Sequence, residues 1–189
     1  SDLEVVLKVT GSLGEGTLAA DIYVPILDVM SDLKIRTLAE IEEALQNKHI
    51  SFNQLVQAIL VFCGSGTLSA TQEDHQISRS KLHSDNLNMH LMLKARSSHE
   101  ISFLASPVTG GGIVATRFQQ LFLLAIKQGL DKPEEWVKFV SQMLASQGQK
   151  IIKDGNLIEA LEDQLVELTV QANEFVLKRL PIFKALQIA

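Results

Sequence analysis

The chain has 189 residues, of which 46% are hydrophobic and 21% are charged, as in ordinary globular domains. The formal net charge of −5 disfavours a nucleic-acid partner, because binding to phosphates needs clustered lysine and arginine side chains. A single cysteine excludes an internal disulfide and favours a reducing, cytoplasmic compartment, and no apolar run reaches the roughly 18 residues of a membrane span.

The N-terminal residues predict a β-hairpin. Residues 3–9 are rich in β-branched side chains, the run Gly11-Ser-Leu-Gly-Glu-Gly16 follows, and residues 17–20 read as a returning strand. Val24-Pro25 then predicts the start of a helix.

The chain does not begin with Met and starts within the pattern LEVVLKV, which lacks the parts of a signal peptide. We therefore expect a piece excised from a longer protein.

Two capping boxes predict the next two helices. Thr37 and Glu40 form the first, and Ser51 and Gln54 form the second; apolar residues follow each at helical spacing. The second helix should end at Gly64-Ser-Gly66, and residues 67–70 predict a short strand. Helix, short turn, helix and strand is the order of a winged helix-turn-helix.

The polar residues 71–86 contain the best candidate for a linker. We place this linker at 76–83, between a first domain at 1–75 and a second at 84–189. Residues 85–96 predict a helix, although Leu87, Met89, Leu91 and Leu93 also alternate as in a strand.

The second half predicts the same order of elements. Residues 101–105 predict a strand, residues 117–127 a helix, and Pro133 starts another helix that Gly148 ends. Asp154-Gly155 predicts a hairpin, and a long helix at 159–179 should end before Pro181. The predicted fold is mostly α with small β-wings (α+β), as two winged-helix-like halves packed together.

Three segments carry a resemblance to a known family: LKVTGSLGEGTLAADIYVPILDVM, FLASPVTGGGIVATRFQQLFLLA and SQGQKIIKDGNLIEALEDQLVEL. Together they resemble the C-terminal regulatory region of bacterial S-adenosylmethionine-dependent methyltransferases, a group that includes lysine methyltransferases acting on surface proteins. The resemblance covers nearly the whole chain. Its most specific parts are residues 105–110, residues 147–149 and Lys153-Asp154-Gly155.

The resemblance implies that a Rossmann-like catalytic domain, which holds S-adenosylmethionine, precedes this region. No catalytic, cofactor-binding or metal-binding residue is therefore assigned within this chain. The expected partners are that methyltransferase domain and a protein substrate, with no nucleic acid. The implied function is a non-catalytic accessory, regulatory or substrate-recognition region; the alternative is a winged-helix DNA-binding transcription regulator.

The triplet Gly110-Gly111-Gly112 raises the question of a phosphate-binding loop. It lacks the G-x-G-x-x-G spacing, and no Lys-Ser/Thr pair follows as in a Walker A loop. Pro107 favours extended geometry at Ser106, and glycine allows positive φ. We predict a structural bend, with at least one of the glycines at positive φ.

The histidines and the cysteine predict no chemistry. Clustered ligands at tight spacing, as in zinc sites, are missing around the histidines, which are therefore expected at the surface or as helix caps. They are His49, His75, His83, His90 and His99. Cys63 has no neighbouring base and is expected as a small buried hydrophobe.

Residues 51–62 would form the recognition helix of a DNA-binding module. Asn53, Gln54 and Gln57 are able to read bases, but this helix contains no lysine or arginine to hold phosphates. A scaffold or a protein contact surface is the preferred interpretation. The remaining carboxylates are expected in solvated positions or at helix starts: Glu40, Glu42, Glu43, Glu159, Glu162 and Asp163.

Overall fold

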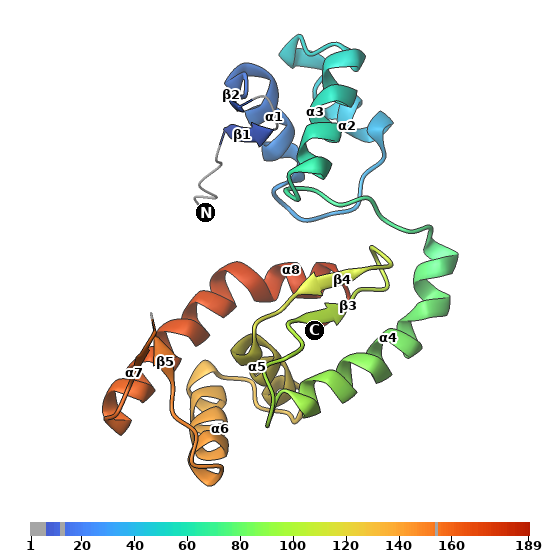
Figure 1. The fold of residues 1–189 in the computed structure, drawn as a ribbon. Helices are drawn as coiled ribbons and strands as arrows, with labels where there is room; N and C mark the ends of the chain where they lie inside the picture. Colours follow the sequence, from blue (N-terminus) through green and yellow to red (C-terminus); the bar gives the residue numbers. More distant parts are fainter. Residues whose placement is uncertain (1–6, 12–13, 154) are drawn as a thin grey trace. The chain divides into compact units, whose positions relative to one another are not determined.

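The computed structural model describes residues 7–11, 14–153 and 155–189 and is mostly helical, with short antiparallel hairpins (Figure 1). This confirms the prediction of a mostly α chain with small β elements. The chain divides into two compact units, Ser1–Thr71 and Gln72–Ala189. The division lies close to the predicted end of the first domain at residue 75.

The first unit begins with a hairpin, as expected, but its second strand shares only Thr17 with the predicted returning strand at 17–20. Strand β1 (Lys8–Gly11) pairs antiparallel with β2 (Gly14–Thr17), whereas the predicted first strand also included residues 3–6, which lie outside the described residues. Helix α1 (Ala20–Met30) starts five residues earlier than Pro25 suggested. Pro25 removes one backbone hydrogen bond and crowds the carbonyl one turn earlier. The helix nevertheless continues through it, with the next residue, Ile26, fully buried.

Both capping boxes in this unit are present. Helix α2 (Leu38–Ala44) begins after Thr37, and α3 (Phe52–Gly64) begins after Ser51; between them a short 3₁₀ turn, η1, spans Gln46–Lys48. In each box the N-cap hydroxyl accepts from the third backbone N–H of the helix, while the side chain at that position accepts from the N-cap N–H.

The core of the first unit lies where α1 packs against α2 and α3. Ile26, Ile41 and Leu55 are buried there, and the rings of Tyr23 and Phe62 meet edge to face with centroids 5.2 Å apart. Burial of these side chains stabilises the unit, because each removes apolar surface from water.

The strand predicted at residues 67–70 is not formed. After α3 the chain turns through Gly66 at φ 76°, and the N–H groups of Thr67 and Leu68 both donate to the carbonyl of Phe62, at 2.9 and 3.1 Å. The chain thus closes the end of the helix and then runs on without a strand partner. The first unit therefore has no wing after α3.

The second unit begins with the long helix α4 (Asp74–Lys94). This helix contains all of residues 76–83, so the predicted linker was wrong. Its polar composition reflects a solvated helix, because Ile77 is buried while the hydroxyls of Ser78 and Ser80 donate to carbonyls one turn earlier.

The next elements follow the prediction closely. Strand β3 (Phe103–Ala105) pairs antiparallel with β4 (Gly112–Val114), and β3 packs against α4. Helix α5 has the predicted bounds, Arg117–Lys127, and α6 (Pro133–Ser146) starts at the predicted proline. Gly148 follows α6 at φ 62°, as expected for a glycine beyond a helix end.

The C-terminal part contains the predicted hairpin, which we call the wing. It consists of β5 (Ile152–Lys153) and β6 (Asn156–Leu157), with Ile152 opposite Leu157. Gly155 has φ 80°, whereas Asp154 lies outside the described residues. Helix α5, helix α6 and the wing thus give this unit the element order of a winged helix.

The last helix does not end at Pro181. Helix α7 (Leu161–Glu174) continues through a π-helical turn, η2 (Phe175–Arg179), into α8 (Leu180–Ala185). Within the π turn the N–H of Leu180 donates to the carbonyl of Phe175. Pro181 falls in the first turn of α8, directly after the π turn, where the changed hydrogen-bond register accommodates a residue without an N–H.

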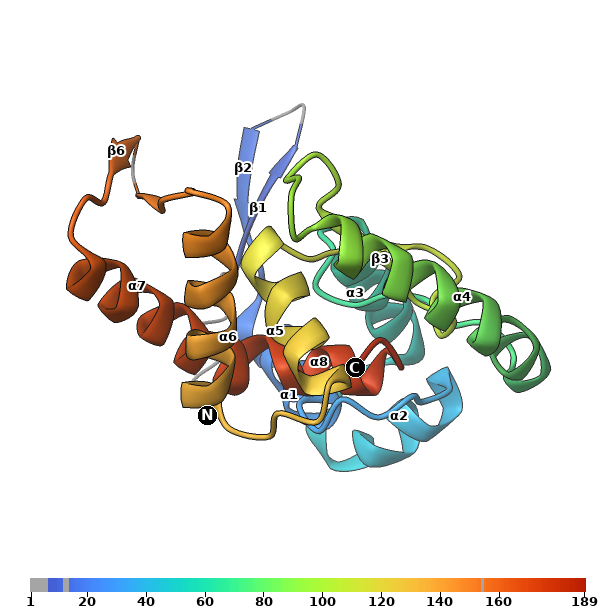
Figure 2. The same ribbon diagram turned by 90° about the horizontal axis from the view of Figure 1, so that it is seen from below.

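An aromatic cluster forms the centre of the second core. The ring of Phe175 lies 5.6 Å from Phe122, 5.9 Å from Trp136 and 6.0 Å from Phe183, measured between centroids. Helix α6 packs against both α5 and α7 around this cluster (Figure 2). In the described part of the chain, no helix combines the length and apolar character needed to cross a bilayer.

Candidate protein-binding site

The glycine-rich loop between β3 and β4 is a tight turn. Gly110 has φ 70°, and its N–H donates to the carbonyl of Ser106 at 2.9 Å. The hydroxyl of Ser106 accepts from the N–H groups of Val108 and Thr109 at 3.2 Å and donates to Leu186 at 2.9 Å. The positive φ confirms the prediction of a bend. These amides already have acceptors within the loop, whereas a phosphate-binding loop presents free N–H groups.

The histidines do not converge on a site. Each of the five is exposed, and His49 follows the 3₁₀ turn with φ 54°. Among the described residues, no group of three His, Cys, Asp or Glu side chains is placed to hold a metal ion. Cys63 is exposed, so its predicted burial is wrong. The buried face of α3 carries Leu55, Ala58 and Phe62. Consecutive residues of an α-helix are about 100° apart around its axis, so Cys63 lies off this face.

Helix α3 offers little that could read DNA. The Oε1 atom of Gln54 accepts from the N–H of Ser51 at 2.9 Å and from its hydroxyl at 2.8 Å, so this amide is committed to the helix start. Asn53 and Gln57 are exposed, but the helix carries no positive charge that would hold them near a phosphate backbone.

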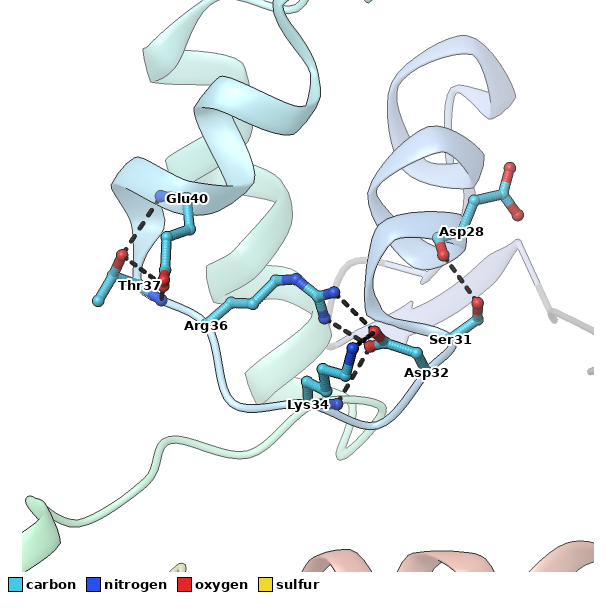
Figure 3. Close-up of polar contacts among 7 residues, drawn as sticks. All are labelled: Asp28, Ser31, Asp32, Lys34, Arg36, Thr37 and Glu40. Atoms are coloured by element: carbon cyan, nitrogen blue, oxygen red, sulfur yellow. Dashed lines mark hydrogen bonds and ion pairs between the residues drawn. The ribbon is translucent and has the colours of Figure 1, made fainter.

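The connection between α1 and α2 contains a compact polar network centred on Asp32 (Figure 3). The carboxylate of Asp32 accepts from both terminal nitrogens of Arg36, at 2.5 and 2.7 Å, and from the N–H of Lys34 at 3.1 Å. Hydrogen bonds from Arg36 hold the pKa of Asp32 well below its usual range. Because Leu33 adopts φ 59°, an unfavourable conformation for its side chain, the network supports a strained turn.

The predicted carboxylate groups lie at helix starts or on exposed helix faces, as expected. The N–H and hydroxyl of Thr37 donate to Glu40 and lower its pKa, whereas Glu42 and Glu43 are exposed. Glu159 pairs with Lys150 just before α7. Glu162 and Asp163 lie in the first turn of α7. Negative charge at this position is stabilising, because the N-terminus is the positive end of the helix dipole.

Glu167, which the sequence did not single out, connects the wing to α7. Its buried carboxylate accepts from the ammonium of Lys153 at 2.6 Å and from the amide of Gln171 at 2.8 Å. These hydrogen bonds, first that of Lys153, lower the pKa of Glu167. The four-residue spacing to Gln171 was visible in the sequence, but the contact with Lys153 depends on how the wing packs.

Four exposed apolar side chains gather on the wing and on α7. Ile152 and Leu157 are 67% and 49% exposed and oppose each other on one face of the hairpin, and Val166 and Val170 are 64% and 55% exposed, one turn apart. We call these four residues the wing–α7 surface. Large apolar side chains that gather on a surface mark an interaction site more often than isolated ones do.

A shallow depression of about 520 Å³ adjoins this surface at Leu157 and Val166. It lies between the wing and the first turns of α7; Figure 2 shows the course of the backbone there. Leu157 and Val166 contribute apolar area, and Asp163 and Glu167 contribute carboxylates. The lining residues include no serine, cysteine or histidine. Lys153 and Glu167 also line the depression, where they bind each other.

In a comparison with known proteins, the chain matches part of a longer relative. No family model and no solved structure matches it. A Synechocystis protein, named as the uncharacterized protein sll1526, is 37% identical over 184 residues. The match covers 97% of the chain but 35% of that protein, so the chain spans about a third of the length of the curated relative it matches.

Proposed function

We propose that this chain is the non-catalytic accessory region of a larger, cytoplasmic S-adenosylmethionine-dependent methyltransferase, and that it acts by binding protein. The bound protein is the catalytic domain or the methyl acceptor, of which a protein lysine is the preferred candidate. In this proposal the catalytic domain lies N-terminal to the chain and holds the cofactor.

The observation that carries the protein-binding part of the proposal is the wing–α7 surface. Its side chains leave apolar area in water on a short hairpin and on one face of a helix, although the same unit has a well-filled aromatic core. Covering this area with another polypeptide would be favourable, because burial of apolar surface stabilises a complex.

The sheet topology and the length of the relative support the proposal that the cofactor is held by a separate domain. The described strands form separate two-stranded antiparallel sheets. A Rossmann-like domain instead needs a parallel sheet, with a glycine-rich turn leading into a helix. About two thirds of the Synechocystis relative lies outside the match, which leaves room for such a domain in a protein of that length.

Calorimetry on the full-length protein and on the 189-residue chain tests this proposal. We expect the full-length protein to bind S-adenosylmethionine and the chain alone to bind none. Micromolar binding by the chain alone, or no binding by the full-length protein, would contradict the proposal that a separate domain holds the cofactor. A salt-sensitive gel shift of duplex DNA by the chain would instead favour the transcription-regulator alternative.

The role of the surface needs a paired comparison in the full-length protein. Val166→Asp should lower methyl transfer to a protein acceptor, because it places a charge in the apolar contact, while cofactor binding stays unchanged. Leu60→Asp, at a residue that is 66% exposed on α3, is the matched control. Equal loss of methyl transfer in both variants would show that the wing–α7 surface has no specific role in it.

A further inference from the structure

We infer that the depression beside the wing–α7 surface binds a cationic, aliphatic segment of a partner protein, in which a lysine or arginine is flanked by apolar residues. The inference rests on the proposed role of this surface in protein binding. It identifies the chemistry of the partner from the charges and the apolar area around the depression.

The first argument is that the cations around the depression are already engaged. The ammonium of Lys153 binds Glu167, Lys150 pairs with Glu159, and Lys178 pairs with Glu174 further along the helix. In the residues that the structure describes, no lysine, arginine or histidine lies within 4.0 Å of the carboxylates of Glu162 and Asp163. This side of the surface therefore has a surplus of negative charge.

The second argument is the position of that charge beside apolar area. Asp163 lines the depression together with Leu157 and Val166. The side chain of lysine or arginine combines an aliphatic stem with a cationic head, so its stem would cover Leu157 and Val166 while its head meets Asp163. A volume of about 520 Å³ also leaves room for a neighbouring aliphatic side chain.

The same charges disfavour other occupants. An anionic segment or an anionic lipid surface would place like charges against Glu162 and Asp163. A second copy of the chain, with its net charge of −5, would bring the same carboxylates face to face in a symmetric contact. A cationic partner gains from both the charge and the apolar area.

Fluorescence anisotropy on the 189-residue chain tests the inference with a defined probe. The probe is a labelled 12-residue peptide of Leu, Lys, Ala and Gln, and the comparison peptide has each Lys replaced by Glu. We expect the lysine peptide to bind, binding to weaken with added salt, and the glutamate peptide not to bind. Equal binding of both peptides, or no binding of either, would overturn the inference.

Matched variants separate the depression from the general acidity of the chain. Asp163→Asn should weaken binding about two- to fivefold, as for a single exposed ion pair. Asp74→Asn makes the same charge change in the first turn of α4 and should leave affinity unchanged. Val166→Ser should weaken binding about threefold, because less apolar area is buried. Leu60→Ser is its control on α3.

Equal effects of Asp163→Asn and Asp74→Asn would show non-specific attraction and would also overturn the inference. This outcome is distinct from failure of the proposed function. Binding of S-adenosylmethionine by the full-length protein does not depend on the depression, so calorimetry and anisotropy report on the two proposals separately.

Discussion

The side chain of Asn88 pairs with the backbone of Ala105 as a neighbouring strand would. Its Nδ2 donates to the carbonyl of Ala105 at 2.8 Å, and its Oδ1 accepts from the N–H of the same residue at 2.7 Å. Asn88 lies on α4 and is 1% exposed, whereas Ala105 ends β3. One buried amide thereby joins the hairpin to the helix and satisfies two backbone groups at its outer edge.

Asn88→Ala should lower the free energy of unfolding by about 2 to 3 kcal/mol, because it leaves both backbone groups of Ala105 without a partner. Urea denaturation measures this change. Asn86→Ala, two residues earlier at an exposed position of α4, should stay within about 0.5 kcal/mol of the parent. Similar values for the two variants would show that the paired hydrogen bonds do not stabilise the hairpin.

Gly110→Ala should destabilise the chain by about 1 kcal/mol or more, because alanine is strained at positive φ. At φ 70° an added Cβ would also lie 2.8 Å from Nε2 of Gln72. Gly111→Ala is the matched control, since its Cβ would meet only Thr109 Oγ1, at 3.9 Å. Thermal melts should show a lower Tm for the first variant alone; if Gly111→Ala is equally destabilised, the explanation by positive φ is wrong.

Arg117→Lys should cost about 2 kcal/mol, because lysine cannot reproduce the planar set of donors that arginine presents. The guanidinium donates to the carbonyls of Ala95 and Arg96 and to Oε1 of Gln149, at 2.6 to 2.8 Å. It thus connects the end of α4 to the segment before the wing. Arg79→Lys, at an exposed position of α4, should leave the denaturation midpoint unchanged.

The pair formed by Lys153 and Glu167 predicts a pH dependence of stability. The folded-state pKa of Glu167 is lowered, so its contribution is fully present above the unfolded pKa of about 4.3 and is lost as pH falls below that value. The denaturation midpoint should fall as the pH is lowered from roughly 6 to roughly 3. This fall should be smaller in Glu167→Gln than in the parent, because the variant has no carboxylate to protonate. Parallel curves for the two proteins would contradict the assignment.

Local signals in the sequence were sufficient for three helix starts, those of α2, α3 and α6. The boxes at Thr37 and Ser51 and the proline at 133 each act within one turn, so their hydrogen bonds depend on neighbouring residues alone. The hairpin at Gly155 is local in the same way. These predictions held because tertiary packing has little influence on the first turn of a helix or on a tight turn.

Predictions that depended on packing failed more often. The polar residues 76–83 read as a linker, yet Ile77 is buried and the segment is helical. Pro181 read as a helix end, yet a π turn places it at a new helix start. Glu167 is recognisable only once the wing lies beside α7, since its partner Lys153 is 14 positions away. Such contacts leave no periodic pattern in the sequence.

The shortness of the wing has a consequence for the rate at which partners exchange. The hairpin has two paired positions on each strand, continued by one hydrogen bond from Ile158 to Ile151 at 2.8 Å. So few backbone bonds should open at little free-energy cost, and we expect its amides to exchange with deuterium long before those of the aromatic core. A partner that binds there would have to offset the free energy of keeping the hairpin closed, which weakens the complex. A contact of this kind favours repeated, brief encounters over a permanent complex.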